Sequence, residues 1–584
     1  MLREPISKAM RRFNNNAALL LVILLIAGIN WLASRYHTAV DFTAEKRFTL
    51  SASTKKLLRN LEAPVEIDVL LAGDIRSEFK KLATSTAELL QNFRNYGGNR
   101  IRFRFEIPGE GLSDSAKAYV YDSLVTMGLR PTNQQVQVKE GEGKNQRQIF
   151  PGAILTYGNK QVAVDLLQGQ VQKNVFSSDN LLDKQSLNSA EALLEYKFAH
   201  AIQQLTQKET PVVAYAYGNG EPPYGFPPVH SLFETLGRNF IIDTFNLQNN
   251  PIIDTTYAAV VIVKPDKPFS DDDKFKLDQY VMNGGRLFFL VDMLYAERDS
   301  LEQSELTAYA RDLQLNDLLF RYGVRIKTDL LADKHCDMIP VEVGSIGGNP
   351  QRQLLPWPYA PLLQPGSDHP IVKNQADVLA QFANPLEPVN EGMGDVRKTV
   401  LLASSPNANV LPTPARVTLN DLQTEEDIRR YNKKNVPVAV LLEGTFSSLF
   451  ANRTSEAQLA LLKSVNMPLQ KTSVLPGKVI VAGDADLVIN QVSEQIGPLP
   501  MGANKYTKVQ YANKDFFLNC VEYLANPNNI LDARAKDYTL RLLDQEKVAR
   551  QGNQWRWINL LVPVALVLLF AAVFQWQRRK RYTR

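Results

Sequence analysis

The chain has 584 residues, of which 45% are hydrophobic and 22% charged, a composition typical of a folded protein with room for two or three domains. Its net charge of +5 is concentrated at the two ends, because residues 1–16 carry +3 and residues 577–584 carry +5, which leaves −3 for everything between them. This distribution provides no basic surface for nucleic acid, and a nucleic-acid-binding function is excluded.

The first apolar run, Ala17–Leu32, lies in a stretch without charge from Asn14 through Ser34, long enough to cross a bilayer. We predict a cytoplasmic tail over residues 1–16 and a transmembrane helix over residues 17–36. Basic residues precede the run, which places that side in the cytoplasm. A cleaved signal peptide is the alternative, but Trp31 and Leu32 stand where small residues should precede a cleavage site.

Residues 37–208 are predicted to form an outer α/β domain. Strands are expected at Val65–Leu71 and Ile101–Ile107, with helices over Phe79–Tyr96 and Asp114–Met127. Two further strands are expected to form a hairpin about Gly158-Asn159, and a helix over Ser189–Gln207 follows. The order βαβαββα predicts a thioredoxin-like fold, in which Phe150-Pro151 occupies the usual place of a cis proline. The chain has no CxxC sequence, so redox chemistry is excluded.

Residues 209–537 are predicted to form a second outer domain with a doubly wound parallel sheet. Strand-like and helix-like segments alternate from Pro211 to Asp292, which is typical of such a sheet. Ser270 is expected to cap the helix that begins at Asp271–Asp273, where the helix dipole favours acidic residues. A metal site at those three aspartates is the less favoured alternative.

A β-rich insertion is predicted from about residue 335 to residue 476, where Pro, Asn and Gln are frequent. Lys478–Asn490 then restores the parallel-strand pattern, so we expect the chain to re-enter the sheet that it left. Cys336 and Cys520 are too few for a disulfide framework. A single bridge between them and two buried thiols both remain open.

The C-terminal end repeats the features of the N-terminal end. We predict a juxtamembrane helix over residues 538–556, a transmembrane helix over residues 557–576 and a basic cytoplasmic tail over residues 577–584. Both termini then face the cytoplasm, and the whole middle of the chain lies in the periplasm, outside the inner membrane.

Most catalytic signatures are absent from the sequence. Gly218-x-Gly220 is followed by two prolines instead of a helix-opening glycine, and Gly141–Asn145 lacks the remainder of a phosphate loop. There is no GxSxG sequence. His335-Cys336-Asp337 combines three ligand types, but three consecutive residues cannot surround a metal. The sequence therefore predicts no enzyme, no cofactor and no metal.

Four acidic residues each directly follow a predicted parallel strand: Glu221, Asp292, Asp484 and Asp486. The carboxyl ends of parallel strands share one edge of a sheet, where ligands bind. These acids are therefore candidate residues for a cation or a cationic ligand. The alternative is that each one caps the turn or helix that follows it.

Several segments resemble the periplasmic part of auxiliary ABC-transporter proteins, in particular the gliding-motility-associated components of GldG type from Bacteroidota. The segments are YGNGE, DQYVMNGGRLFFLVD, VAVLLEGTFSSLFANR, GDADLVIN, NKDFFLNCVEYL and the final span with RRKRYTR. The resemblance implies a class I amidotransferase-like outer domain without the catalytic cysteine. It also implies a multispanning permease (GldF type) and a cytoplasmic ATPase (GldA type) as partners.

The expected function is that of a non-enzymatic, membrane-anchored subunit of an ABC-type complex for gliding motility and linked protein secretion, whose outer part binds a partner or substrate. The alternative is an anchored periplasmic enzyme or sugar-binding receptor on the same fold. Self-association remains open in either case.

Overall fold

The computed structural model describes residues 24–28, 30, 49–75, 77–129, 131–136, 145–167, 190–297, 305–346, 349–389, 395–419, 428–526, 533 and 545–582. The chain forms two compact units, residues 1–536 and residues 537–584, and each is described by itself. The predicted tail 1–16, most of the predicted first span 17–36 and the start of the predicted juxtamembrane helix, 538–544, lie outside the described residues.

The first part of the larger unit contains a four-stranded mixed sheet in the order β2-β1-β5-β6. Its strands are β1 (Val65–Val69), β2 (Ile101–Phe105), β5 (Gly152–Tyr157) and β6 (Lys160–Asp165). β1 runs parallel to β2 and antiparallel to β5, and β5 and β6 form the predicted hairpin, with Gly158 at φ 58°. The bond before Pro151 is not cis, so that detail of the prediction was wrong.

Helices lie on both faces of this small sheet. They are α2 (Ala52–Arg59), α3 (Ser77–Gly97), α4 (Asp114–Thr126) and α6 (Leu194–Thr206), with η1 at Gly98–Arg100 and a separate hairpin of β3 (Thr132–Val136) and β4 (Asn145–Ile149). Leu124 of α4 packs with Leu70 and Phe150 in a small cluster, while α2, α3 and α6 contribute to the large core on the opposite face. The opposite orientation of neighbouring side chains in each strand separates these two cores.

The second part is built on a ten-stranded sheet in the order β15-β16-β19-β22-β23-β10-β9-β7-β8, with β17 beside β16. The strands are β7 (Val212–Tyr217), β8 (Ile241–Asn246), β9 (Ala259–Val263), β10 (Arg286–Leu290), β15 (Cys336–Ile346), β16 (Asn349–Pro365), β17 (Val378–Leu379), β19 (Val396–Ala403), β22 (Pro437–Gly444) and β23 (Gly477–Ala482). β23 pairs in parallel with β10, so the chain re-enters the sheet that it left, as predicted.

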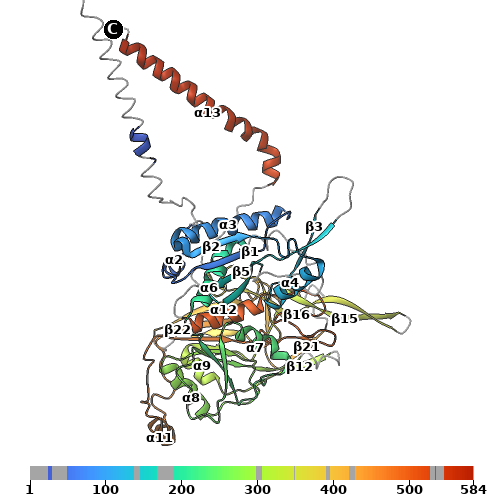
Figure 1. Ribbon diagram of the computed structural model, residues 1–584. Coiled ribbons are helices and arrows are strands. Elements are labelled where there is room, and N and C mark those ends of the chain that lie inside the picture. The colour runs from blue at the N-terminus through green and yellow to red at the C-terminus, as the bar shows by residue number, and fades with distance from the viewer. Residues whose placement is uncertain are drawn as a thin grey trace, which may run out of the picture. The chain divides into compact units, whose positions relative to one another are not determined.

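The sheet is mixed, which differs from the expectation of a parallel sheet. β8, β7, β9, β10 and β23 are parallel, whereas β22, β19, β16 and β15 continue the sheet with antiparallel pairings. The antiparallel strands come from the segment predicted as an insertion, and β15 and β16 extend from it as a long hairpin (Figure 1). Strand patterning shows that a segment is extended, but it does not show which neighbour it pairs with.

Both faces of the large sheet are covered. Alternate residues of β9 enter different cores: Val261 packs on the side of α7 (His230–Gly237) and α12 (Asn513–Ala525), and Val260 packs on the side of α8 (Asp271–Met282) and α9 (Asn316–Tyr322). The remaining elements are β11 (Leu294–Tyr295), β12 (Glu305–Ala310), β13 (Val324–Ile326), β14 (Leu330–Asp333), β18 (Leu386–Pro388), β20 (Ala408–Leu411), β21 (Ala415–Thr418), β24 (Val492–Ser493), β25 (Gly497–Pro498), α11 (Glu456–Ser464) and η2 (Pro227–Val229). Trp357 is the largest buried side chain of a third core, formed by the β-rich segment.

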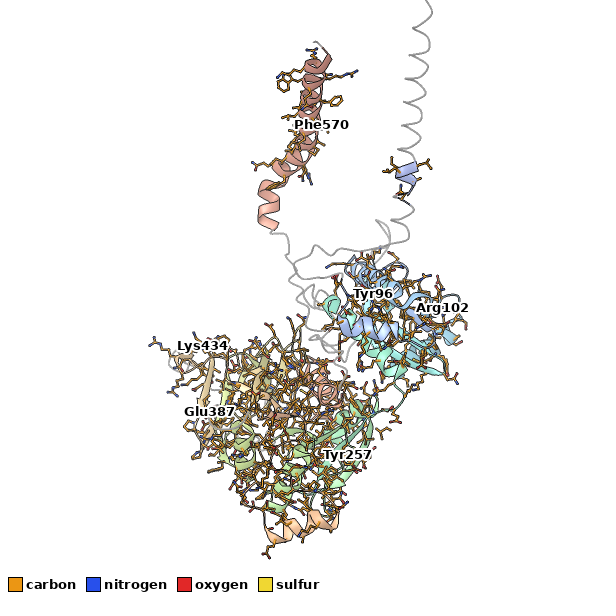
Figure 2. The ribbon with its side chains drawn as sticks, turned by 90° about the vertical axis from the view of Figure 1, so that its left-hand side faces the viewer. Tyr96, Arg102, Tyr257, Glu387, Lys434 and Phe570 are labelled. Carbon is orange, nitrogen blue, oxygen red and sulfur yellow. The ribbon has the colours of Figure 1, made fainter. Side chains whose placement is uncertain are left out.

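The smaller unit consists of one long helix, α13 (Gln545–Tyr582). The helix includes the apolar segment Gln554–Lys580, none of which is buried, and Figure 2 labels Phe570 within it. The segment is long and apolar enough to cross a membrane. The described part of the predicted juxtamembrane helix and the predicted second span are therefore one continuous helix. The two-span arrangement remains a prediction.

Candidate functional site

The carboxyl edge of the parallel strands is the place where the sequence predicted a site. The chain leaves β7 for β8 on one side and returns to β9 on the other side of β7, which creates a switch of direction at this edge. Ligands of open α/β sheets bind in the crevice at such a point. The residues that follow β7, β9, β10 and β23 lie along this edge, and they include all four predicted acids.

Two of the four acids pair with a lysine of the same chain, and a third, Asp484, lies beside them. The Nζ atom of Lys264, directly after β9, lies 2.6 Å from Oδ1 of Asp486 and 3.5 Å from Oδ2 of Asp292. Glu297 is a further partner at 3.5 Å, and the Lys264 side chain is only 16% exposed. The cation that these carboxylates surround is thus supplied by the protein. We call Lys264, Asp292, Glu297, Asp484 and Asp486 the strand-end cluster.

The backbone at Lys264 is held in an unusual conformation. Its φ is 49°, in the left-handed region that non-glycine residues seldom adopt, while its N–H donates to the carbonyl oxygen of Leu290 at 2.9 Å. Such a conformation persists only where the surroundings enforce it. The Leu290 hydrogen bond and the ion pairs to Asp486 and Asp292 are the contacts that hold Lys264 there.

Backbone N–H groups also donate to the acids of this cluster. Asp484 accepts from Gln381 at 2.7 Å and from Asp486 at 2.7 Å, and Asp292 accepts from Ala485 at 2.6 Å. The Asp486 N–H bond is the local turn cap that the alternative describes for Asp484. Asp292 instead accepts from a residue 193 positions away, so it joins two loops and does not cap the turn that follows it.

Burial dominates the titration of the cluster. It raises the pKa of Asp484 well above its ordinary value, with the charges of Asp486 and Asp292 adding to the effect. Burial also raises the pKa of Asp486 to about 6, although Lys264 opposes the shift. Burial alone would lower the pKa of Lys264, but its acidic neighbours raise it. Lys264 is therefore charged at neutral pH, and the buried Asp484 favours its neutral form.

The fourth predicted acid, Glu221, lies apart. It is 7% exposed, and its Oε2 accepts from the N–H of Asn219 at 2.7 Å. Among the described residues it makes no hydrogen bond or ion pair with Lys264 or with the other three acids. Burial raises the pKa of Glu221 to about 7. Gly220 has a φ of 89°, where a side chain is strained, and a Cβ atom there would also displace the Asp266 carboxylate.

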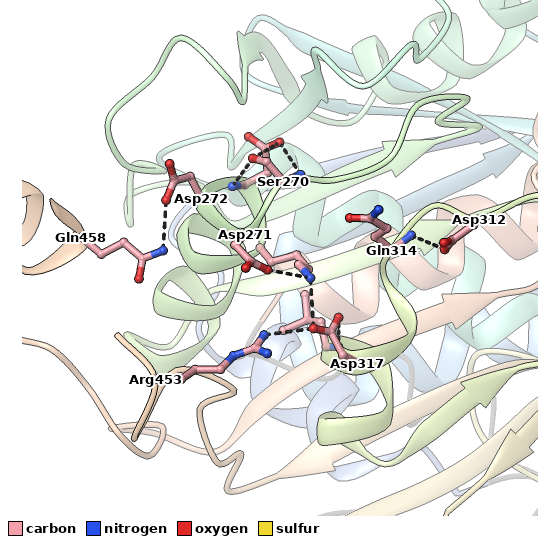
Figure 3. Close-up of polar contacts among 11 residues, drawn as sticks. Ser270, Asp271, Asp272, Asp312, Gln314, Asp317, Arg453 and Gln458 are labelled. Carbon is pink, nitrogen blue, oxygen red and sulfur yellow. Dashed lines mark hydrogen bonds and ion pairs between the residues drawn. The ribbon is translucent and has the colours of Figure 1, made fainter. Parts of the chain in front are cut away.

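Ser270 caps α8, as predicted, and the three aspartates Asp271–Asp273 lie in its first turn. Ser270 and Asp273 form a capping box in which each side chain accepts from the backbone N–H of the other residue. Asp271 pairs with Lys274 at 2.9 Å, and Asp272 accepts from Gln458 at 3.0 Å (Figure 3). Each carboxylate thus has a protein partner. In the part of the chain that the structure describes, no three His, Cys, Asp or Glu side chains form a group suited to a metal.

The side chains of His335 and Asp337 have different hydrogen-bond partners and do not converge on one site. His335 Nε2 lies 2.7 Å from Asp377, whereas Asp337 accepts from Asn504 at 2.6 Å and from Tyr511 at 2.8 Å. Burial raises the pKa of Cys336 to about 12, so its thiol is a poor nucleophile. No disulfide joins Cys336 to Cys520.

Sequence reasoning missed two polar features of this domain. Lys264 ends a predicted strand in the same way as the four acids, so the rule that selected them would also have selected it. Asp278 was read only as part of a helix, yet its buried carboxylate accepts from Tyr322, Ser448 and the Leu449 N–H at 3.1, 2.6 and 3.0 Å. No local sequence signal marks that network, because its members are far apart in the chain.

Comparison with known proteins agrees with an accessory role in transport. The family described as "ABC-type uncharacterized transport system" matches residues 210–520, and the chain belongs to this family of auxiliary ABC-transporter proteins. Residues 44–156 match a family described only as a domain of unknown function, DUF7088. No curated protein matches the chain.

The solved structures that resemble the chain are distant. The mmIFT52 N-terminal domain is 13% identical, with a TM-score of 0.29, over 54% of this chain and 97% of that one. A putative ThuA-like protein from Parabacteroides merdae ATCC 43184 is 10% identical, with a TM-score of 0.24, over 55% and 91%. The exo-beta-1,4-mannosidase Op5Man5 from Opitutaceae bacterium strain TAV5 is 8% identical, with a TM-score of 0.19, over 52% and 35%. Likenesses at this level carry no argument about function.

Proposed function

We propose that this protein is a non-enzymatic, membrane-anchored subunit of an ABC-type transporter complex that serves gliding motility and linked protein secretion. Its folded part lies in the periplasm, where it binds a partner or substrate, and both termini are cytoplasmic. The family match over residues 210–520 carries the transport assignment. The exposed apolar helix Gln554–Lys580 supports the membrane anchor.

The proposed partners are a multispanning permease of GldF type and a cytoplasmic ATPase of GldA type. One or two membrane helices cannot enclose a translocation path, and the apolar part of α13 offers no charged residue for an ion route between Trp557 and Trp576. The sequence Ala571-Ala572 in that helix suits close contact with another membrane helix. We infer that α13 docks on the permease.

Two finer fold assignments belong to the same proposal. The small sheet has the order β2-β1-β5-β6 with β5 antiparallel to β1, which supports a thioredoxin-like domain. The parallel half of the large sheet supports a class I amidotransferase-like origin for the second domain. In this proposal neither domain retains catalysis.

For the strand-end cluster we propose a structural role, with Glu221, Asp292, Asp484 and Asp486 kept as candidate ligand-edge residues for testing. Lys264 already neutralises Asp486 and Asp292, and backbone N–H groups saturate Asp484. Each acid is replaced singly by Ala and gliding is measured at matched protein levels. Normal gliding in all four variants supports the structural role, and a loss in a variant of unchanged stability supports a ligand site.

The main test is purification of the tagged full-length protein from native membranes in mild detergent, followed by mass spectrometry. We expect a permease and an ATPase to co-purify in constant ratio. If the protein purifies alone under several mild detergents, the transporter proposal fails. Protease treatment of spheroplasts tests the topology, because the folded part should be cut while the membrane is intact.

The alternative, an anchored periplasmic enzyme or sugar-binding receptor, predicts turnover or ligand binding without a transporter. The full-length protein in detergent is assayed for ATP hydrolysis and for glutamine hydrolysis. We expect neither activity above that of a mock purification. Turnover that scales with protein concentration and is lost in a point variant would favour the enzyme.

A linker experiment tests whether α13 couples the folded part rigidly to the complex. A flexible Gly/Ser insertion after Arg550 interrupts α13 before its apolar part, and an (EAAAK)-type insertion of equal length serves as the stiff control. We expect the flexible variant to be expressed but to impair gliding, and the stiff variant to retain more activity. Full gliding with the flexible linker contradicts rigid coupling.

A further inference from the structure

Strand β6 lies at one end of the small sheet and pairs only with β5, so its other edge has no neighbouring strand. Just after β6, the Leu166 N–H donates to the Pro151 carbonyl oxygen at 3.0 Å. Hydrogen-bonded and non-hydrogen-bonded pairs alternate along an antiparallel ladder, so the backbone N–H and C=O groups of Gln161 and Ala163 point away from β5. In the part of the chain that the structure describes, these four outward groups make no hydrogen bond.

A cavity of about 430 Å³ lies along this free edge. Five consecutive residues of β6, 161–165, line it. Successive residues of a strand face opposite sides of its sheet, so a cavity that touches all five borders the edge of β6 and not one face. We call it the edge cavity. Its other walls come from the end of α4 and from α6, α7 and α12, and the exposed Gln161 marks its opening to solvent.

The charges around the edge cavity balance one another. Its lining contains three basic and three acidic side chains: Lys197, Arg238, Lys514, Asp165, Asp515 and Glu522. Lys197 donates to a backbone carbonyl oxygen at 2.5 Å, and Arg238 pairs with Glu234 at 2.7 Å. Glu522 accepts from the Tyr196 hydroxyl at 2.6 Å. A balanced lining whose charges are held by the protein favours a neutral hydrogen-bonding group over an anion or a cation.

The sequence of β6 also lacks the features that protect the other sheet ends from strand addition. β15 contains Pro340 and two register shifts, β2 contains Arg102 and Arg104, and β8 contains Asp243. Proline, bulges and charged side chains all hinder the pairing of a further strand. In β6 the charges are confined to the two end residues, and QVAV between them has neither a proline nor a register shift.

We propose that the edge cavity binds an extended segment of a partner polypeptide, which adds to β6 as a fifth strand of the small sheet. Its backbone exchanges hydrogen bonds with Gln161 and Ala163, which are two residues apart and match the repeat of an extended chain, about 7 Å. The volume of the cavity limits the inserted part to a few residues with small, uncharged side chains. This inference rests on the proposed function, because it names how the folded part binds a partner.

The test begins with a random dodecapeptide library displayed on phage and selected on the full-length protein in detergent. The selected peptides are synthesised, and their affinities are measured by fluorescence anisotropy. An added strand bonds to its neighbour through every second N–H only. We therefore expect N-methylation of alternate peptide nitrogens to abolish binding in one register and to preserve it in the other. If no peptide binds saturably, or if both methylation patterns have equal effects, the proposal is overturned.

Proline substitution on β6 tests the location. Ala163→Pro removes an outward N–H and leaves the hydrogen bonds to β5 in place, as edge strands allow, whereas Ala163→Ser keeps this N–H. We expect the proline variant to weaken peptide binding by about tenfold, the value of one lost hydrogen bond, and the serine variant to bind as the parent does. Gln161→Pro is the second test if Ala163→Pro does not fold. Parental affinity in a proline variant with an unchanged thermal unfolding midpoint overturns the assignment.

Hydrogen exchange over β6 separates a partner peptide from other occupants of this edge. We expect the outward amides to exchange readily in the purified protein and to be protected once a selected peptide is bound. Protection without peptide would mean that a second copy or another segment of this chain covers the edge, and would overturn the proposal. Absence of the permease and the ATPase from the purified complex contradicts the transport role alone, so the two failures can be told apart.

Discussion

The strand-end cluster and the network around Asp278 both contain buried carboxylates, yet the two regions satisfy them with different donors. At the strand ends, Asp292, Asp484 and Asp486 each have a backbone donor or the Lys264 ammonium as a partner. Asp278 instead accepts from the Tyr322 and Ser448 hydroxyl groups and from the Leu449 N–H. Convergence of acids therefore does not by itself identify a ligand site. The informative feature is whether the protein itself supplies the donors that each carboxylate needs.

Removing the positive charge of Lys264 is expected to give the largest change in the free energy of unfolding. Lys264→Ala leaves Asp486 and Asp292 close together without their ammonium, which we expect to destabilise the fold by about 3 kcal/mol. Urea unfolding of the full-length protein in detergent measures the change, with Lys267→Ala, an exposed neighbour, as the control. Adding Asp486→Ala should recover part of the loss. An unchanged unfolding midpoint would mean that the fold does not need Lys264 to neutralise Asp486 and Asp292.

An isosteric substitution tests the carboxylate that hydroxyl and backbone donors hold. Asp278 accepts from Tyr322, Ser448 and Leu449, so Asp278→Asn turns an amide donor toward existing donors and should cost about 1–3 kcal/mol. Thermal unfolding measures the loss. An unchanged unfolding midpoint would mean that this network does not stabilise the fold.

The pH dependence of stability tests the remaining predicted acid, Glu221. Its pKa is raised by burial from 4.5 to about 7, so the folded state binds a proton that the unfolded state releases. This protonation of Glu221 contributes its full stabilisation below about pH 4.5, and the contribution is lost as the pH rises through about 7. Glu221→Gln should therefore stabilise the protein by about 1–3 kcal/mol at pH 8 and flatten this dependence.

Urea unfolding at pH 5 and pH 8 provides the measurement for Glu221→Gln. The exposed Glu209→Gln variant is the control, and it should follow the parent at both values. A Glu221→Gln protein that is less stable than the parent at pH 8 would show that the ionised carboxylate is needed there. That result would return Glu221 to the list of candidate ligand residues.

The smallest expected effect concerns an exposed ion pair near the start of α8. Arg453 and Lys274 both contact Asp317, at 2.9 and 3.0 Å, but Arg453 is 45% exposed and Lys274 only 6% (Figure 3). Arg453→Ala should change the unfolding free energy by less than about 1 kcal/mol because water solvates both groups. Lys274→Ala should cost more. The reverse order would contradict burial as the deciding factor.

Much of the local structure could be predicted from the sequence. The helix over Phe79–Tyr96 occurs as Ser77–Gly97, the hairpin about Gly158 forms, and Ser270 caps α8. These features depend on residues close together in the chain, such as a glycine suited to positive φ or a serine three residues before an aspartate. The return of β23 to the sheet as a parallel strand was also foreseen from its continuous apolar pattern, whereas its partner β10 was not.

The candidate site could be predicted only in part. The rule that parallel strands end at one edge selected Asp292, Asp484 and Asp486, and these residues do meet. It also selected Glu221, which makes no contact with them in the described part of the chain. The rule gives the edge on which a residue lies but not its position along that edge. It overlooked Lys264 because the search was for acids.

The sequence by itself determined which segments are extended, which are helical and which carry the apolar length for a membrane, since these properties follow from nearest-neighbour chemistry and periodicity. Tertiary structure alone decided the charge balance at the strand ends, the antiparallel extension of the large sheet and the contact between α6 and α12. The physical reason is that each of these features joins separate segments of the chain: Val440 pairs with Val481 in the sheet, Lys264 contacts Asp486 across 222 positions, and Tyr196 contacts Glu522 across 326. Such contacts leave no local signal, because a hydrogen bond depends on where two side chains meet in space.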